Sequence, residues 1–216
     1  MKKILLFMGA VALSYTSIAQ TQVTQGDIII DPYIGTPNWA NSLLYNQVNL
    51  EDTENVTDYK LNGGLLSYGG RVEYMISDDF GIGVDVNYEV SGFNYNNAVS
   101  EYDSLTNTLT NATYNYDYKA KKLRAMLRLN YHFIQTDRID VYSSFAGGYK
   151  YVNRIGESND LNYENDELDG ALIPVAFRLA AGARVYFTNN IGAHIELGAF
   201  GGALLQFGIS AKFPTR

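Results

Sequence analysis

Residues 66–90, LSYGGRVEYMISDDFGIGVDVNYEV, contain two runs of alternating side chains separated by a short polar segment. In the second run every even position from Phe80 to Val90 is apolar, whereas Asp85, Asn87 and Glu89 occupy odd positions. Successive side chains of a β-strand point to opposite faces, so this pattern predicts strands with one apolar and one polar face. The segment 77–79 predicts a tight turn that joins them as an antiparallel pair.

The same alternation recurs outward from this stretch in both directions. It predicts eight strands in all, the others near residues 28–36, 122–133, 139–151, 173–187, 191–200 and 204–213. The connections alternate in length: those near 77–79, 134–138 and 188–190 are short, while 37–62, 94–118 and 152–170 are long and polar. We therefore expect an all-β fold, an eight-stranded antiparallel up-and-down barrel with short turns at one end and long loops at the other.

The two faces of these strands differ sharply in charge. The apolar faces carry no charged residue, and the opposite faces carry eight basic and six acidic side chains: Arg71, Lys122, Arg124, Arg128, Lys150, Arg178, Arg184, Lys212, Asp31, Glu73, Asp85, Glu89, Asp140 and Glu196. A soluble, lipocalin-like barrel would put the apolar face inside, whereas a membrane barrel turns it toward lipid. Aromatic residues cluster at the short-turn ends of the strands, as an interfacial girdle requires: Tyr74, Phe80, Tyr131, Phe133, Phe187 and Phe213. This favours a transmembrane barrel.

Length and composition exclude several classes of function. The 216-residue chain has a formal net charge of -7, which argues against a nucleic-acid partner because phosphates need a basic surface. It contains no cysteine and two histidines, which leaves no disulfide scaffold, no thiolate site and little scope for histidine-rich metal chemistry. We expect no cofactor and no metal.

The first nineteen residues have the organisation of a secretory signal peptide. Lys2 and Lys3 precede an apolar run over residues 4–13, which is too short to span a bilayer, and Ser17-Ile18-Ala19 fits a signal-peptidase site. We therefore expect residues 1–19 to be a cleaved signal peptide and residues 20–216 to form the barrel domain. This predicts export to the outer membrane of a Gram-negative bacterium.

The terminal strands carry a resemblance to a known family. GDIIIDPYIGTPN at residues 26–38 and GGALLQFGISAKF at residues 201–213 resemble the first and last strands of small OmpA/OmpX-type outer-membrane β-barrel proteins, particularly Bacteroidetes-type members. Phe213 resembles the aromatic residue of the terminal assembly signal, although Pro214-Thr215-Arg216 follow it.

The resemblance implies a structural, adhesive or surface-interaction role without catalysis. The expected partners are outer-membrane lipid, the insertion machinery, and a protein or surface ligand at the long loops, which are rich in tyrosine: Tyr102, Tyr114, Tyr116, Tyr118 and Tyr163. Porin-like permeation is the first alternative. A lipid-modifying enzyme is the second.

Two sets of residues carry testable roles. At mid-strand on the uncharged face we expect lipid-facing side chains at Leu127, Val175, Phe177 and Ile209. On the other face we expect a structural charge network that plugs the lumen, made of Arg71, Glu73, Asp85, Glu89, Arg124, Arg128, Arg178, Arg184 and Glu196. Counting along the strands predicts contacts of Arg71 and Arg128 with Asp85, and of Arg124 with Glu89, because an unpaired buried charge is costly.

The sequence also contains residues that could suggest chemistry. His194 and Glu196 share a strand face and His132 could join them, but we interpret them as parts of a polar lumen. Asp160, Asn162, Glu164 and Asp166 recur at every second position, yet Asn165 stands where a calcium loop needs glycine. We expect a solvated acidic loop there and predict no catalytic, cofactor-binding or metal site.

Overall fold

The computed structural model describes residues 22–38, 56–61, 66–103, 108–163, 166–171 and 173–215. Residues 1–19, expected to be the signal peptide, lie outside these ranges. Within them no helix is long and apolar enough to cross a membrane.

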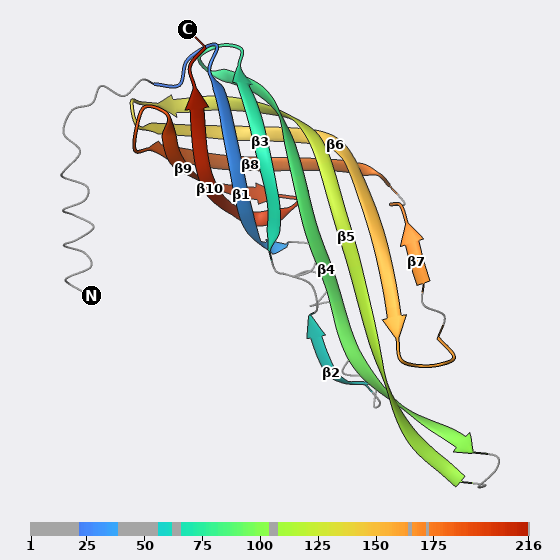
Figure 1. Ribbon diagram of the computed structural model, residues 1–216. Helices are drawn as coiled ribbons and strands as arrows, with labels where there is room; N and C mark the ends of the chain where they lie inside the picture. The colour runs from blue at the N-terminus through green and yellow to red at the C-terminus, as the bar shows by residue number, and fades with distance from the viewer. Residues whose placement is uncertain are drawn as a thin grey trace, which may run out of the picture.

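The described residues form ten antiparallel strands, eight of which close into a ring (Figure 1). They are β1 (Ile28–Asn38), β2 (Val56–Leu61), β3 (Ser67–Met75), β4 (Phe80–Asp103), β5 (Thr108–Gln135), β6 (Ile139–Ser158), β7 (Asp166–Asp169), β8 (Val175–Tyr186), β9 (Ile191–Ala199) and β10 (Ala203–Phe213). The order around the ring is β4-β3-β1-β10-β9-β8-β6-β5, and β5 pairs back with β4. The expected eight-stranded antiparallel barrel is confirmed, because the first and last strands pair from Ile28–Phe213 to Asn38–Ala203.

Three tight turns, the start of β1 and the end of β10 lie at one end of the barrel. Residues 76–79, 136–138 and 187–190 join β3 to β4, β5 to β6 and β8 to β9. At the other end, which we call the far end, β9 turns directly into β10 at residues 200–202. Gly201 and Gly202 have φ values of 56° and 140°, and a Cβ on Gly201 would overlap the backbone of Phe177, so glycine is required there.

The segment 94–118, expected to be a loop, is a β-hairpin instead. β4 and β5 stay in register without interruption from Phe80–Tyr131 to Asp103–Thr108. Past Tyr88, β4 continues for about 50 Å at roughly 3.3 Å per residue. The prediction failed because the apolar outer face of β4 ends at Val90, beyond which Phe93 and Tyr95 alternate with asparagine on the opposite face while the backbone ladder persists.

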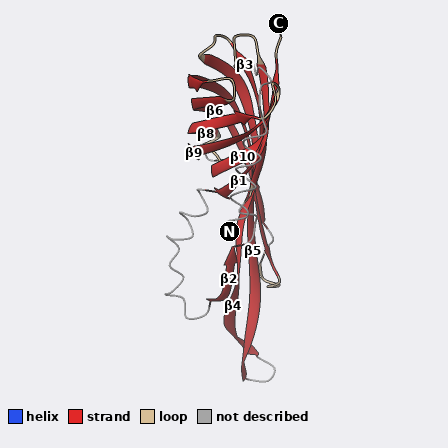
Figure 2. Cartoon of the chain, turned by 90° about the vertical axis from the view of Figure 1, so that its left-hand side faces the viewer, coloured by secondary structure: helices blue, strands red, loops and turns tan. Residues whose placement is uncertain are grey.

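Three strands extend past the far rim on one side only. The extensions of β4, β5 and β6 form one sheet with β2 at one edge and β7 at the other. Figure 2 shows this sheet as a narrow continuation of one wall of the barrel. We call it the blade and define it as residues 91–103, 108–120 and 152–158 with β2 and β7.

Burial is inverted relative to a soluble protein. Large apolar side chains alternate outward around the ring; Val84, Leu129, Phe145 and Ile195 are all exposed. The buried interior is mostly polar or charged and contains five arginines, Arg71, Arg124, Arg128, Arg178 and Arg184. A soluble barrel would bury the apolar face, so this arrangement disagrees with the lipocalin-like alternative and has the pattern of a barrel surrounded by lipid.

Candidate functional site

The lumen is filled by a charge network in three tiers. The tier nearest the short turns centres on Arg184 of β8, whose guanidinium lies 2.8 Å from Asp31 of β1, 2.6 Å from Glu73 of β3 and 2.8 Å from Asp140 of β6. His132 of β5 lies 2.6 Å from Asp140 and 3.0 Å from Glu73. All five side chains are buried, so one cation and one histidine hold three carboxylates in place.

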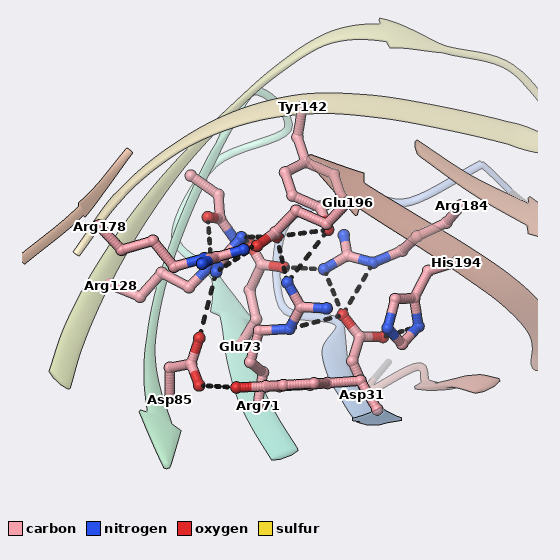
Figure 3. A network of polar contacts seen from close by, with 12 residues as sticks. Asp31, Arg71, Glu73, Asp85, Arg128, Tyr142, Arg178, Arg184, His194 and Glu196 are labelled. Carbon is pink, nitrogen blue, oxygen red and sulfur yellow. Dashed lines mark hydrogen bonds and ion pairs between the residues drawn. The ribbon is translucent and has the colours of Figure 1, made fainter. Parts of the chain in front are cut away.

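The middle tier centres on Glu196 of β9. Its carboxylate forms ion pairs with Arg71 and Arg128 and lies 3.1 Å from Nε of Arg178. Tyr142 of β6 donates its hydroxyl to the same carboxylate at 3.1 Å. In Figure 3 these side chains converge on Glu196 from four different strands. One carboxylate therefore joins three guanidinium groups in the centre of the barrel.

Asp85 completes the middle tier. It accepts a hydrogen bond from the Tyr33 hydroxyl at 2.6 Å and lies 3.3 Å from Arg128. The Arg71 guanidinium lies over the Tyr33 ring, 4.8 Å from its centroid. Charge pairs and cation–π contacts thus share the same closed space.

The third tier, which we call the mouth tier, lies at the far rim. Glu89 of β4 lies 2.7 Å from Arg124 and 3.5 Å from Lys122, both on β5. Glu89 pairs in register with Ser67, the first residue of β3, so this tier is level with the far end of that strand. Lys150 of β6 stands directly opposite Arg124 of β5 in the strand register and adds a third cation. Side-chain exposure rises here, from 2% at Arg71 and Arg128 to 7% at Arg124 and 15% at Lys122.

These contacts run across the lumen as well as around its wall. Arg184 on β8 and Glu73 on β3 belong to strands on opposite sides of the ring. Glycine makes room for the largest side chains: a Cβ on Gly182 would overlap the ring of Tyr142. The expected network residues are therefore all inside the barrel, and several cross-link its walls.

Two of the three expected ion pairs are present. Arg128 contacts Asp85 and Arg124 contacts Glu89. Arg71 does not pair with Asp85; its guanidinium contacts Glu196 and lies 3.9 Å from Asp31. Counting residues along the strands predicted this contact, and Arg71 and Asp85 do stand opposite each other in the register of β3 and β4. The long side chain of Arg71, however, reaches across the lumen to Glu196.

Sequence reasoning omitted several members of the network. Asp31 and Asp140 were recognised as residues of the polar face but not as network members, and Asn130 donates to Glu73 at 2.5 Å. Tyr142 was not among the expected network residues either, yet its hydroxyl donates to Glu196. Their position on the charged face was the available signal, because every such position at mid-strand points into the lumen.

The histidines do not form a nucleophilic triad. His194 Nδ1 lies 3.1 Å from the Ser210 hydroxyl and 3.8 Å from Asp31, so both neighbours meet the same ring nitrogen. A general base needs one nitrogen for the nucleophile and the other for its orienting acid. Ser210 is also fully buried. His132 belongs to the Arg184 tier, away from this pair.

The acidic run of the third long segment does not form a calcium loop in its described part. Asp160 accepts hydrogen bonds from the backbone of Asn162 and from the Tyr116 hydroxyl. Glu164 lies outside the described residues, and Asp166 begins β7. Among the residues that the structure describes, no group of three or more His, Asp or Glu side chains is placed to hold a metal ion.

The residues expected to face lipid lie on the outer wall. Leu127 is 73% exposed, and Val175, Phe177 and Ile209 are also exposed on the strands of the ring. Phe213 is exposed at the end of β10, where it pairs with Ile28. The six aromatic residues of the short-turn end are exposed as well, and Phe80 and Tyr131 pack at 5.0 Å between ring centroids.

Five aromatic rings line the lumen-side face of the blade, and we call them the ring ladder. Phe93 pairs with Tyr118, and Tyr95 with Tyr116, across β4 and β5, with centroids 5.2 and 5.3 Å apart. Tyr163 packs edge-on against Tyr116 at 5.5 Å. Partial burial and the Asp160 carboxylate raise the pKa of Tyr116, which therefore stays protonated at neutral pH.

The ladder contains three of the five tyrosines expected at the loops. Tyr114 lies further along the same face of β5, whereas nothing is described for the side chain of Tyr102. The sequence showed the aromatic content of this segment but not its order, because the stacking depends on the β4–β5 register.

The chain is similar to several solved structures at low sequence identity. No protein-family model and no curated protein sequence matches the chain. The N-terminal β-barrel domain of Pseudomonas aeruginosa OprF has 15% identity and a TM-score of 0.46 over 88% of this chain and 99% of that one. Ail, the attachment invasion locus protein of Yersinia pestis, has 12% identity and a TM-score of 0.43 over 88% and 99%. The outer membrane protein OprG from Pseudomonas aeruginosa has 12% identity and a TM-score of 0.43 over 91% and 99%.

Proposed function

We propose that this chain is a non-enzymatic outer-membrane β-barrel of the OmpA/OmpX type, with a plugged lumen and a surface-interaction role in adhesion or envelope integrity. The observation that carries the proposal is the inverted burial of the ring. Its outer wall exposes apolar side chains, and its interior encloses arginines and carboxylates. Lipid around the barrel removes the cost of the exposed apolar wall, and the pairing of charges lowers the cost of the polar interior.

The charge network supports the plugged lumen. Eight strands leave an interior about wide enough for side chains, whereas porins with aqueous channels use ~16–18 strands. The Arg184 and Glu196 clusters join strands across that interior. Opening a continuous pore would break several enclosed ion pairs together, and removing even one partner of such a pair typically costs about 3–5 kcal/mol.

The blade supports the interaction role. It rises from β4, β5 and β6 as a paired sheet, and its ring ladder gives contact area at low entropic cost. We infer that the blade lies outside the cell, because the short turns, the start of β1 and the end of β10 lie at the opposite end of the barrel. Outer-membrane lipid and the insertion machinery are the other partners in this proposal.

Two measurements test this function. Since the chain has no cysteine, Thr113→Cys on the blade and Asp137→Cys in a short turn each give a single labelling site. A membrane-impermeant maleimide should label the first on intact cells and the second only after permeabilisation; the reverse pattern would refute the orientation. Single-channel recording of the refolded protein in a planar bilayer should show no stable conductance, and long-lived steps would support permeation instead.

A further inference from the structure

The lumen charges are distributed unevenly along the barrel. In the tier nearest the short turns, Arg184 and the buried Lys212 face the carboxylates of Asp31, Glu73 and Asp140. Among the described residues the balance is reversed in the mouth tier: Lys122 and Arg124 share the carboxylate of Glu89, and Lys150 adds a cation with no carboxylate in contact. The far mouth therefore carries an excess of positive charge in a largely enclosed space, where uncompensated charge is costly.

The placement of these cations also opposes strand pairing. Arg124 and Lys150 are directly opposite each other on β5 and β6, and like charges in that position destabilise a sheet. Within the described residues, no carboxylate lies within 4.0 Å of the Lys150 ammonium. A bound anion would neutralise the excess charge at this point.

Buried polar atoms beside the cations remain without hydrogen-bond partners in the described part of the chain. Glu89 and Asn87 are almost fully buried; Glu89 Oε1 and Asn87 Oδ1 both accept hydrogen bonds from Arg124. Glu89 Oε2 and Asn87 Nδ2 are unpaired. These two atoms lie beneath the cations with almost no exposed surface, so the described residues leave the polar interior of the mouth tier incompletely paired.

The ring ladder continues the same face of the sheet. Phe93 and Tyr118 follow Glu89 and Lys122 by four residues on β4 and β5, so their side chains point to the same side, about 13 Å further along the strands. The faces of aromatic rings carry negative potential, which attracts the polarised C–H bonds on the face of a sugar ring. Cations and aromatic rings thus lie in sequence along one surface.

We propose that the far mouth binds a short acidic oligosaccharide, with its anionic group among Lys122, Arg124 and Lys150 and its sugar rings on the ring ladder. The ligand is free in solution or carried by another cell surface. The lumen-side face of the blade points away from the sugars of the lipids that surround the outer wall, so these sugars are not the ligand. Asp160, which accepts a hydrogen bond from Tyr116 of the ring ladder, disfavours a long polyanion such as a nucleic acid along this face. This inference rests on the proposed function only in requiring the blade to face outward in cells.

The test is titration calorimetry on the protein refolded in detergent micelles. The probes are a trisaccharide with one carboxylated sugar, its uncharged parent disaccharide, inorganic sulfate and a ten-nucleotide thymidine strand. The carboxylated trisaccharide should bind, more weakly as salt rises, and the uncharged disaccharide should bind about tenfold less tightly or not at all. Tighter binding of the thymidine strand, or sulfate binding equal to that of the trisaccharide, would overturn the proposal.

Paired variants assign the binding to this surface. Lys122→Gln with Lys150→Gln should weaken trisaccharide binding at least about tenfold, and so should Tyr95→Ser with Tyr118→Ser. The matched controls are Lys121→Gln and Tyr151→Ser, on the opposite face of the same strands, which should leave binding unchanged. Circular dichroism of each variant checks that the barrel is folded. If the folded test variants bind the trisaccharide as tightly as the folded control variants, the proposed site is refuted.

The two proposals fail separately. Calorimetry in micelles does not depend on membrane orientation, so a blade that proves inaccessible on intact cells refutes the proposed function alone. If the blade is labelled on intact cells but the protein does not bind the trisaccharide, only this inference is refuted.

Discussion

Glu196→Gln should be among the most destabilising single substitutions in the barrel. The substitution keeps the shape of the side chain and removes the charge that Arg71, Arg128 and Arg178 share. The carboxylates still in contact with these guanidinium groups are then Asp85, 3.3 Å from Arg128, and Asp31, 3.9 Å from Arg71. Removing one partner of a buried ion pair typically costs about 3–5 kcal/mol, and we expect a loss in that range in the free energy of unfolding.

The measurement is urea unfolding of the protein refolded in lipid vesicles, followed by far-ultraviolet circular dichroism. Glu157→Gln is the matched control, because Glu157 is an exposed carboxylate on β6, and it should change the unfolding free energy by no more than about 0.5 kcal/mol. Combining Glu196→Gln with Arg178→Met should cost less than the sum of the two single changes, by about 0.5–3 kcal/mol. A loss below about 1 kcal/mol for Glu196→Gln would refute the argument that enclosed charges hold the walls together.

Three further predictions concern the outer wall, the chain end and the blade. Leu127→Arg should make insertion into vesicles less favourable by about 2–4 kcal/mol. Thr113→Arg on the blade should insert as well as the unmodified protein, and equal insertion yields for the two variants would reject the assigned faces. Phe213→Ser should reduce the folded fraction in cells but not refolding in vitro, and unchanged assembly in cells would contradict its role as the terminal signal. Replacing residues 95–116 with a two-residue turn should leave the barrel able to refold, because Asn94 and Asp117 already pair in register; failure to refold would show that the blade supports the barrel.

The sequence by itself determined the ring and its two faces. Alternation along residues 66–90 assigned each side chain to one face, and the uncharged face could only be the lipid side or a soluble core. It failed for the blade, where the apolar outer face ends and the aromatic rings alternate on the opposite, lumen-side face, although the β4–β5 ladder continues to Asp103 and Thr108. The absence of cysteine and the acidic charge narrowed the functional class without indicating a ligand.

Tertiary structure decided which charges meet. Register places Arg71 beside Asp85, but closure of the ring brings Glu196 from a strand three positions away, and the arginine side chain reaches it across the lumen. The mouth tier depends on closure in the same way, since Lys150 joins Arg124 and Lys122 only because β6 pairs with β5. The alternation of side chains is local, so a single strand encodes it. A contact across a barrel depends on strand order, stagger and side-chain length together, which no single strand encodes.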